Sequence, residues 1–309
     1  MTPMTASIET LASAARSAAR VLAGTSRVDK DRALNAIADH LLAHESEILA
    51  ANNEDVLRSQ AEGISESLID RLKLNPKRIA DIANGARQIA ALPDPVGRVI
   101  RERTLENGLH LKQIAVPFGV VGMVYEARPN VTVDAAVILI KAGSAALLRG
   151  SSTAAKSNEV LVDVMRSAIT SVGLPADIVQ LVSSHDRSTV RELLNARGLV
   201  DLVIPRGSAA LIRTVVDESS VPTIETGAGV CHVYIDKDAD LNKAIPIIIN
   251  SKCHRPSVCN AAETLLVHQS IAAEFLPLAL KALKEQGVRL HGDSQVIQIA
   301  KSCGVEMVL

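Results

Sequence analysis

A cysteine in a basic, polar loop is the residue of this sequence best suited to covalent chemistry. Cys259 lies in the segment RPSVCN, directly before an apolar run typical of a strand. Lys252, His254 and Arg255 precede it, and positive charge near a thiol favours the nucleophilic thiolate. A thiolate can attack an activated acyl group and hold it as a thioester. A buried, inert cysteine is the alternative interpretation.

Two further polar side chains stand where such chemistry would need them. Asn130, in EARPNVTVDAA, lies at the start of a predicted helix, after a strand and a proline. Its amide could donate a hydrogen bond to a developing oxyanion, or it could simply cap the helix. Glu225, in TIETGAGVCH, precedes a glycine-rich turn. It is either a general base or a hinge residue on a solvated edge.

A strand-to-helix turn resembles a phosphate-binding loop without matching it. Residues 150–157 read G-x-x-x-x-A-K-S, with Ala155 where the nucleotide-binding pattern has glycine. Alanine does not readily adopt the positive φ that the second glycine provides. We therefore favour a helix capped by Ser151 and Ser152 whose amino end faces a dinucleotide. A plain turn and a kinase loop remain the alternatives.

A doubly wound parallel sheet is the fold that would gather these residues. From residue 119 the chain alternates short apolar runs with helical segments, which predicts βα units with helices on both faces of the sheet. The expected strands are 119–125, 145–149, 177–182, 199–205 and 230–236, and the expected helices are 133–143, 152–172, 186–196 and 208–219. Gly207 and Ser208, in PRGSAALIR, form a second turn that could hold a diphosphate, although the pattern G-x-G-x-x-G is absent.

Different elements are expected on either side of these units. Residues 8–92 have helical periodicity, with one helix starting at Asn75-Pro76. Asn107-Gly108 joins two alternating segments, 98–104 and 109–116, into a predicted hairpin. An isolated hairpin is marginal in water, so we expect this one to pack on another surface. Further elements are predicted towards the carboxyl end: a helix at 240–252, a strand at 263–268, a helix at 271–287 and a strand at 305–309.

The composition bounds the class of protein. The chain has 309 residues, of which 48% are hydrophobic and 22% charged, so we expect two folded domains. A net charge of −1 and four Phe and Tyr residues in all argue against nucleic acid and anionic membranes as partners. No apolar run reaches the ~18–20 residues of a membrane span. Four cysteines without a CxxC pair predict no metal site. Because the amino-terminal segment has no pattern of an export signal, we expect reduced thiols and a cytoplasmic location, with a mitochondrial transit peptide as the less favoured alternative.

Several long segments, in this order, carry a family resemblance. VPFGVVGMVYEARPNVTVDAA, LLRGSSTAAKSN, IPRGS, GVCHVYID and RPSVCNAAETLLVH resemble the aldehyde dehydrogenase superfamily, and more closely its gamma-glutamyl phosphate reductase family. The resemblance covers almost the whole chain. It implies a dinucleotide-binding domain at residues 1–97 and 116–227, an oligomerisation hairpin at 98–115 and a second α/β catalytic domain at 228–309. Because the family continues past this point, that domain is expected to be incomplete at its carboxyl end.

The resemblance also implies roles for single residues. Cys259 would be the nucleophile, and Asn130 would form the oxyanion hole together with the backbone N–H of Cys259. The cofactor would contact Arg149, Ser151, Gly207 and Ser208. A cation at Arg149 would suit the extra phosphate of NADP. Glu225 occupies the position of the superfamily's water-activating glutamate, which a phosphate-releasing reaction does not need. Substrate would be bound by some of Lys252, His254 and Arg255.

The implied activity is the NADPH-dependent reduction of L-glutamyl 5-phosphate to L-glutamate 5-semialdehyde and phosphate. This is the second step of proline biosynthesis from glutamate. A homo-oligomer formed through the hairpin, acting on a small-molecule substrate, is the expected form. A hydrolytic aldehyde dehydrogenase that uses Glu225, an ATP-binding kinase, and an inactive truncated or interaction protein are the alternatives. Tests of phosphate dependence and of ATP binding separate the first two from the reductase.

Overall fold

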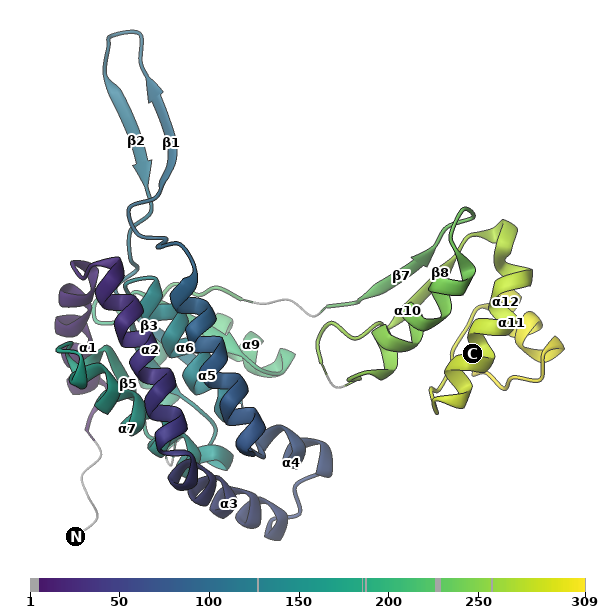
Figure 1. The fold of residues 1–309 in the computed structure, drawn as a ribbon, viewed down its shortest axis with the longest axis horizontal. Coiled ribbons are helices and arrows are strands. Elements are labelled where there is room, and N and C mark those ends of the chain that lie inside the picture. Colours follow the sequence, from purple (N-terminus) through teal and green to yellow (C-terminus); the bar gives the residue numbers. More distant parts are fainter. Residues whose placement is uncertain are drawn as a thin grey trace. The chain divides into compact units, whose positions relative to one another are not determined.

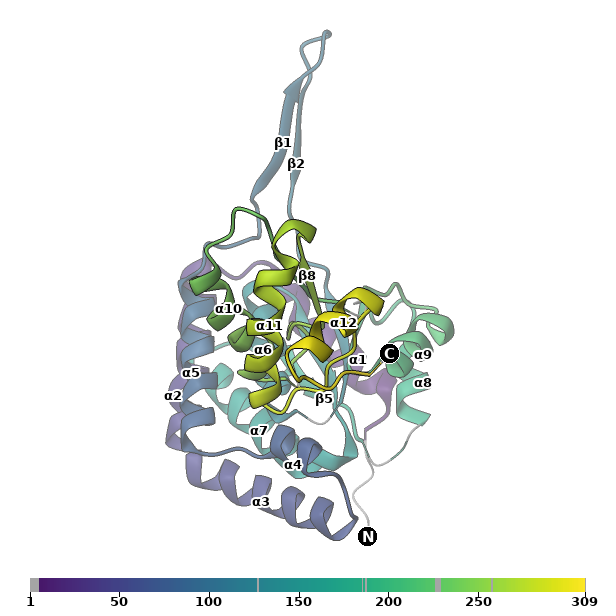
Figure 2. The same cartoon turned by 90° about the vertical axis from the view of Figure 1, so that its right-hand side faces the viewer.

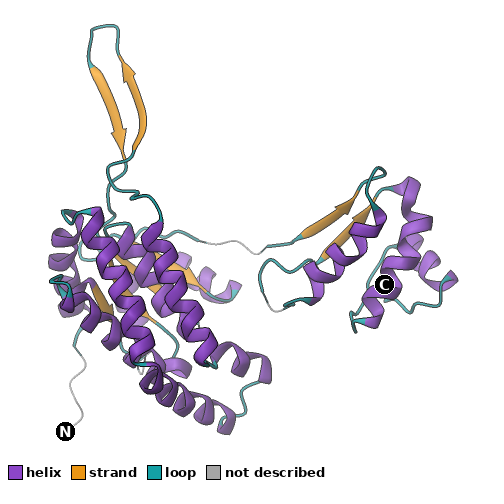
Figure 3. Cartoon of the chain, in the orientation of Figure 1, coloured by secondary structure: helices purple, strands orange, loops and turns teal. Residues whose placement is uncertain are grey.

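The computed structural model divides the chain into two compact units, unit 1 (residues 1–226) and unit 2 (residues 227–309). The structure describes residues 6–126, 128–184, 186, 188–225, 229–256 and 258–308. Both units combine helices with parallel strands (Figures 1 and 3). The predicted α/β class is therefore confirmed. None of the helices in these ranges has the length and apolarity needed to cross a membrane.

Unit 1 begins with five helices, as the helical periodicity of residues 8–92 predicts. They are α1 (Ile8–Ala23), α2 (Arg27–Ala43), α3 (Glu45–Ala61), α4 (Glu66–Leu72) and α5 (Pro76–Ala91). The Asn75 side chain accepts a hydrogen bond of 2.8 Å from the Arg78 N–H, and Pro76 occupies the first turn of α5. The predicted start of this helix is confirmed, because both residues need only local backbone geometry.

The core of unit 1 is a parallel sheet whose described strands run in the order β5-β4-β3-β6. These strands are β3 (Val120–Tyr125), β4 (Ala145–Arg149), β5 (Val179–Leu181) and β6 (Leu202–Arg206). The chain moves outward from β3 through β4 to β5, then crosses back to place β6 on the other side of β3. This reversal is the mark of a doubly wound sheet, and it opens a crevice between the carboxyl ends of β3 and β6.

Helices cover both faces of this sheet. Alternate residues of β3 enter two separate cores, since successive side chains of a strand point to opposite faces. Val121 and Met123 pack with residues from α2, α5, α6 and α7, whereas Val120 and Val124 pack with α1, α8 and α9. Figure 2 shows α2 and α5 on one side of unit 1 and α8 and α9 on the other. The helices not yet delimited are α6 (Pro129–Lys141), α7 (Ala155–Ser171), α8 (Ser188–Leu194) and α9 (Ala209–Glu218), with short 3-10 turns η1 (Ser152–Ala154) and η2 (Ala176–Ile178).

The predicted hairpin is present between α5 and β3. Strands β1 (Val99–Thr104) and β2 (His110–Ile114) pair antiparallel and project from unit 1 (Figure 1). Gly108 adopts a φ of +83°, which explains the Asn-Gly sequence at the turn. Every residue of both strands is exposed, so the hairpin buries neither face within this unit.

Unit 2 is built on a parallel pair of strands with helices packed against it. Its elements are β7 (His232–Ile235), α10 (Leu241–Cys253), β8 (Thr264–Val267), α11 (Gln269–Glu285) and α12 (Ser294–Ser302). The sequence did not predict α12. Of the expected strand at 305–309, residues 305–307 are not in a strand, whereas Val308 forms a parallel bridge with His291. Val305 is buried against α11 and α12, so its apolar pattern reflects helix packing rather than a strand.

Candidate functional site

The predicted cofactor residues lie at the carboxyl edge of the unit 1 sheet. Arg149 ends β4 and Ser151 follows it, while Gly207 and Ser208 follow β6. Since the strands are parallel, these turns open on the same edge. The turn after β6 also borders the crevice between β3 and β6, where doubly wound sheets bind their ligands. The edge is therefore suited to a dinucleotide.

The turn after β6 is tied to the turn after β3 by Glu126. The Ser208 hydroxyl donates to Glu126 Oε1 at 2.6 Å and also accepts the Leu211 N–H at 3.4 Å, which caps α9. A β-carbon at Gly207 would lie 2.6 Å from Glu126 Cδ, so only glycine leaves room for this contact. Glu126 was not among the predicted site residues, although an acidic residue directly after a predicted strand is a usable signal.

The chemical groups of these residues suit the binding of a nicotinamide dinucleotide. A glycine, a hydroxyl side chain and the amino end of α9 are groups that bind a diphosphate. The exposed carboxylate of Glu126 adds an acceptor suited to ribose hydroxyls. Gly207 and Ser208 therefore lie where the resemblance expects cofactor contacts.

The start of α7 differs from the prediction. Ser151 accepts the Thr153 N–H at 3.2 Å and so caps only η1. The Asp55 carboxylate, from α3, instead accepts the N–H groups of Lys156 at 3.3 Å and Ser157 at 2.8 Å. Ser151 thus caps the helical segment where η1 begins, as predicted, but Ser152 makes no cap, and the fully buried Asp55 carboxylate holds the first N–H groups of α7 itself.

A second residue of α3 holds the segment between β4 and α7. Arg58 donates to the carbonyl oxygens of Ser152 at 3.0 Å and Thr153 at 3.1 Å, and it pairs with Asp55 at 2.5 Å. Residues 150–154, which we call the cofactor loop, are thereby fixed from a helix about a hundred positions earlier in the chain. Nothing in the local sequence pattern indicates this contact.

Arg149 is held beside the cofactor loop by main-chain oxygens. Its guanidinium donates to the carbonyl of Gly150 at 3.1 Å and to that of Asp186 at 3.3 Å. A guanidinium has five N–H donors in a fixed plane, which suits it to phosphate groups. The position is compatible with the predicted contact to a cofactor phosphate.

Asn130 is the second residue of α6 and not its cap, which is Arg128. Its side-chain nitrogen donates to Asp134 Oδ2, one turn further along the helix, at 2.9 Å. Burial raises the pKa of the Asp134 carboxyl, and the hydrogen bond from Asn130 opposes this effect. The capping interpretation of Asn130 is therefore excluded, while its amide remains available as a donor group at the sheet edge.

The candidate nucleophile lies in a turn of unit 2. Cys259 is exposed, so the interpretation as a buried, inert cysteine does not apply. The Cys231 thiol donates to the Cys259 carbonyl oxygen at 3.6 Å, and the Glu263 N–H donates to the Cys231 carbonyl at 2.9 Å. The turn is thus fastened to the beginning of β7. The sequence did not indicate this role of Cys231.

The three basic residues near Cys259 differ in their surroundings. His254 and Arg255 are exposed just beyond α10, and Lys252 is half-buried near the end of this helix. Lys252 lines a pocket of about 810 Å³ together with Glu263, Arg289 and other residues. Charged groups that can face a phosphorylated amino acid are therefore present on this side of unit 2.

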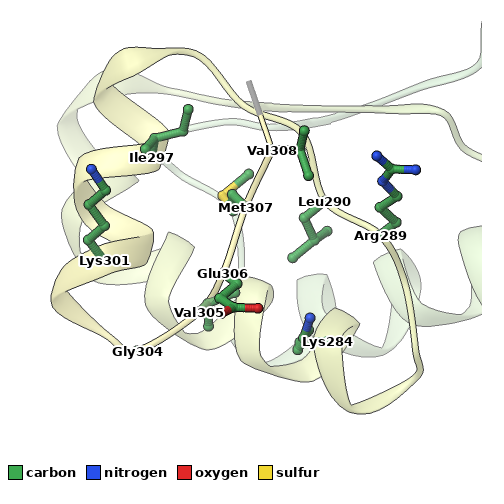
Figure 4. A pocket seen from close by; sticks show the side chains of 10 residues that line it. All are labelled: Lys284, Arg289, Leu290, Ile297, Lys301, Gly304, Val305, Glu306, Met307 and Val308. Atoms are coloured by element: carbon green, nitrogen blue, oxygen red, sulfur yellow. The ribbon is translucent and has the colours of Figure 1, made fainter.

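A neighbouring pocket of about 580 Å³ lies further towards the carboxyl end of the chain. Figure 4 shows Lys284, Arg289 and Lys301 around it, together with Glu306. None of the predicted site residues lines this pocket. It therefore has no part in the candidate site.

Glu225 is exposed at the end of the described part of unit 1, directly before residues 226–228, which lie outside the described residues. Across the described ranges, no group of three or more His, Cys, Asp and Glu side chains could hold a metal ion. The structure thus brings Asn130 and the cofactor residues to one edge of unit 1. It places His254, Arg255 and Cys259 in the segment between α10 and β8 of unit 2, and Lys252 in the last turn of α10.

Comparisons with known proteins give a consistent result. Residues 4–298 match the model of the aldehyde dehydrogenase family. The chain is 56% identical to a gamma-glutamyl phosphate reductase of Kineococcus radiotolerans over 94% of its own length and 67% of that protein. It is 55% identical to the enzyme of that name from Thermobifida fusca, over 96% and 71%. The crystal structure of gamma-glutamyl phosphate reductase from Thermotoga maritima matches with a TM-score of 0.89 at 41% identity, over 97% and 72%.

Proposed function

The chain belongs to the aldehyde dehydrogenase family, and within it to the gamma-glutamyl phosphate reductases; we propose that it reduces L-glutamyl 5-phosphate to L-glutamate 5-semialdehyde and phosphate. The observation that carries this proposal is the 56% identity to a protein of that name over nearly the whole chain. The exposed thiol of Cys259 and the donor groups at the sheet edge supply the chemistry that the reaction needs.

In the proposed mechanism, the Cys259 thiolate attacks the acyl carbon and expels phosphate, which leaves a thioester on the sulfur. The Asn130 amide donates a hydrogen bond to the acyl oxygen, which gains negative charge as the carbon becomes tetrahedral. A nicotinamide dinucleotide held by Arg149, Ser151, Gly207 and Ser208 would supply the hydride that reduces the thioester carbonyl. Cys259 then departs as thiolate, and the semialdehyde is released.

The cofactor is a nicotinamide dinucleotide, and we assign NADP rather than NAD. The support is Arg149, whose guanidinium is held at the end of β4 beside the cofactor loop. The loop itself carries hydroxyl side chains, at Ser151 and Ser152, and no carboxylate. A carboxylate in this position would repel the 2′-phosphate of NADP, whereas a cation attracts it.

The proposal is tested by phosphate-dependent reduction of NADP⁺ with L-glutamate 5-semialdehyde. Wild type should turn over only when phosphate is present, and Cys259→Ser should lose activity while still binding NADPH. Cys303→Ser is the matched control, because this thiol lies beyond α12, away from the predicted site residues. Full activity of Cys259→Ser would refute the role of the thiol.

A hydrolytic aldehyde dehydrogenase is the competing proposal, with Glu225 activating water. The same assay separates the two, because hydrolysis yields L-glutamate without phosphate. Glu225→Gln should leave phosphate-dependent turnover intact if the reductase proposal holds. Loss of turnover in this variant, together with activity in the absence of phosphate, would favour the hydrolytic enzyme.

We also propose that the chain forms a homo-oligomer through the hairpin of residues 98–115 and acts in the cytoplasm. Support for the first comes from five large apolar side chains exposed on or beside the hairpin strands: Val99, Ile100, Leu109, Leu111 and Ile114. Support for the second comes from the cysteines, all of which are free thiols, as expected in a reducing compartment.

A further inference from the structure

We infer that Asp134 is a positioning residue for Asn130, whose amide it orients so that an N–H group faces the reacting acyl oxygen. The inference rests on the proposed function, because it deepens the role that Asn130 has there. It concerns a contact within one helix of unit 1, between residues four positions apart.

The contact decides which end of the amide faces Asp134. An asparagine side chain has an oxygen and an NH₂ group of nearly equal size, and a half-turn exchanges them. An ionised carboxylate only accepts hydrogen bonds, so it selects the nitrogen, as the 2.9 Å contact from Asn130 Nδ2 to Asp134 Oδ2 shows. The second N–H of the same group is then available to another acceptor. Without Asp134, the oxygen of the amide could face the substrate and repel the developing negative charge.

The backbone at this point is fixed independently, which leaves the amide orientation as the variable. Thr132 is fully buried and donates to Asn158 Oδ1 at 2.7 Å. It also shares a hydrogen bond of 2.8 Å with the buried hydroxyl of Tyr125, from the end of β3. These bonds fasten the first turn of α6 to α7 and to the sheet. Because this helix turn is fixed, the amide of Asn130 is preorganised as a donor once its last side-chain torsion is set.

A carboxylate at position 134 does not stabilise the fold, so a purely structural role does not explain it. Burial raises the pKa of its carboxyl, because the charged form loses contact with water. Among the described residues its single hydrogen-bond partner is Asn130, and no ion pair joins it to a lysine or an arginine. A partly buried carboxylate without a cation destabilises the fold that contains it. The hydrogen bond that it accepts from Asn130 provides a functional reason for a carboxylate that lowers the stability of the fold.

The test is a double-mutant cycle between Asp134 and Asn130 in the full chain. Asp134→Asn keeps the size but introduces a group that can also donate, so both orientations of the Asn130 amide become acceptable. We expect kcat to fall about 10-fold, as for other residues that orient a functional group. The KM for NADPH should stay within about twofold, because changes at separate sites act independently. In an Asn130→Ala background the same substitution should lower kcat by less than about twofold, since its target is gone.

Two controls keep the result unambiguous. Asp163→Asn makes the same chemical change at an exposed position of α7 and should leave kcat unchanged. If Asp134→Asn does not fold, Asp134→Ser takes its place, because serine removes the carboxylate and has a smaller side chain. Circular dichroism and NADPH binding establish that each variant is folded.

Each outcome of the cycle has a defined meaning. An unchanged kcat in Asp134→Asn would overturn the inference, and so would an equal loss in both backgrounds, which would show that Asp134 acts without Asn130. Full activity of Asn130→Ala would instead refute the oxyanion role itself, and the inference with it. A loss confined to the background that retains Asn130 would establish the positioning role.

Discussion

Several polar groups at the candidate site of unit 1 are held in place by hydrogen bonds to neighbouring side chains. Asp134 holds the amide of Asn130, and Glu126 holds the hydroxyl of Ser208. Arg58 holds the cofactor loop through its main-chain oxygens. Such supporting contacts restrict the rotamers of the site before any ligand arrives, which reduces the entropy lost on binding.

The position of Arg149 leads to a prediction on cofactor choice. If its guanidinium pairs with the 2′-phosphate, Arg149→Ala should raise the KM for NADPH about 10-fold or more, the expected loss of a hydrogen bond to a charged group. The KM for NADH should change little. Arg87→Ala, a surface arginine of α5 paired with Asp39, is the matched control. Equal losses with both cofactors would show instead that Arg149 only supports the loop.

At the scale of elements, the sequence predicts those features that depend on residues close together in the chain. The β3 strand, the start of α5 at Asn75 and the hairpin turn at Asn107-Gly108 depend on neighbouring residues alone, and all three are present. The first N–H groups of α7 are held by Asp55, about a hundred residues earlier, a contact that the local pattern around Ser151 does not show. Likewise, the roles of Asp134 and Glu126 depend on their hydrogen bonds with Asn130 and Ser208, which the sequence pattern alone does not indicate.

An ion pair at the end of the helical region gives a prediction on stability. Lys30 of α2 is 1% exposed and contacts Asp94 at 2.7 Å, just before the hairpin. Removing one partner of a buried pair leaves a buried charge alone, so Asp94→Ala should cost about 3–5 kcal/mol of unfolding free energy. Asp39→Ala, which removes an exposed partner of Arg87, should cost at most about 1 kcal/mol. Urea unfolding of both variants measures the difference, and similar midpoints would contradict the expectation.

The same pair sets a pH dependence with a defined sign. Burial alone would raise the pKa of the Asp94 carboxyl, but hydrogen bonds from Lys30 and Val96 and the charges of Lys30 and Lys141 outweigh it and lower the pKa. The stabilisation is therefore fully present above the unfolded value of about 3.9 and is lost as the pH falls through the lower folded value. The stability gap between wild type and Asp94→Ala should shrink only in this acidic range.

At the scale of the molecule, the predicted site residues are distributed over two units that each have their own core. The α/β class and the doubly wound sheet followed from the alternation of apolar runs, because buried parallel strands read as continuous hydrophobic segments. The last residues were predicted less well from the sequence. Helix α12 was not predicted, and residues 305–308 form a largely irregular segment. A short apolar run suits a buried loop as well as a strand, and only its packing partners decide between them.

The hairpin carries the prediction that concerns the whole assembly. An isolated two-stranded hairpin is marginally stable, and this one exposes Ile100 and Ile114 at its base by 55% and 50%. If a second copy of the chain covers these side chains, the double variant Ile100→Lys, Ile114→Lys should dissociate the oligomer, because burying a charge without a partner is costly. Light scattering coupled to gel filtration would then show the mass of one chain for this variant and a multiple of it for wild type. Val28→Lys, at an apolar position of α2 that is 73% exposed, controls for the added charge and should retain the wild-type mass. A wild type that is itself monomeric at micromolar concentration would refute the oligomer, whereas a hairpin variant of unchanged mass would place the contact between subunits elsewhere.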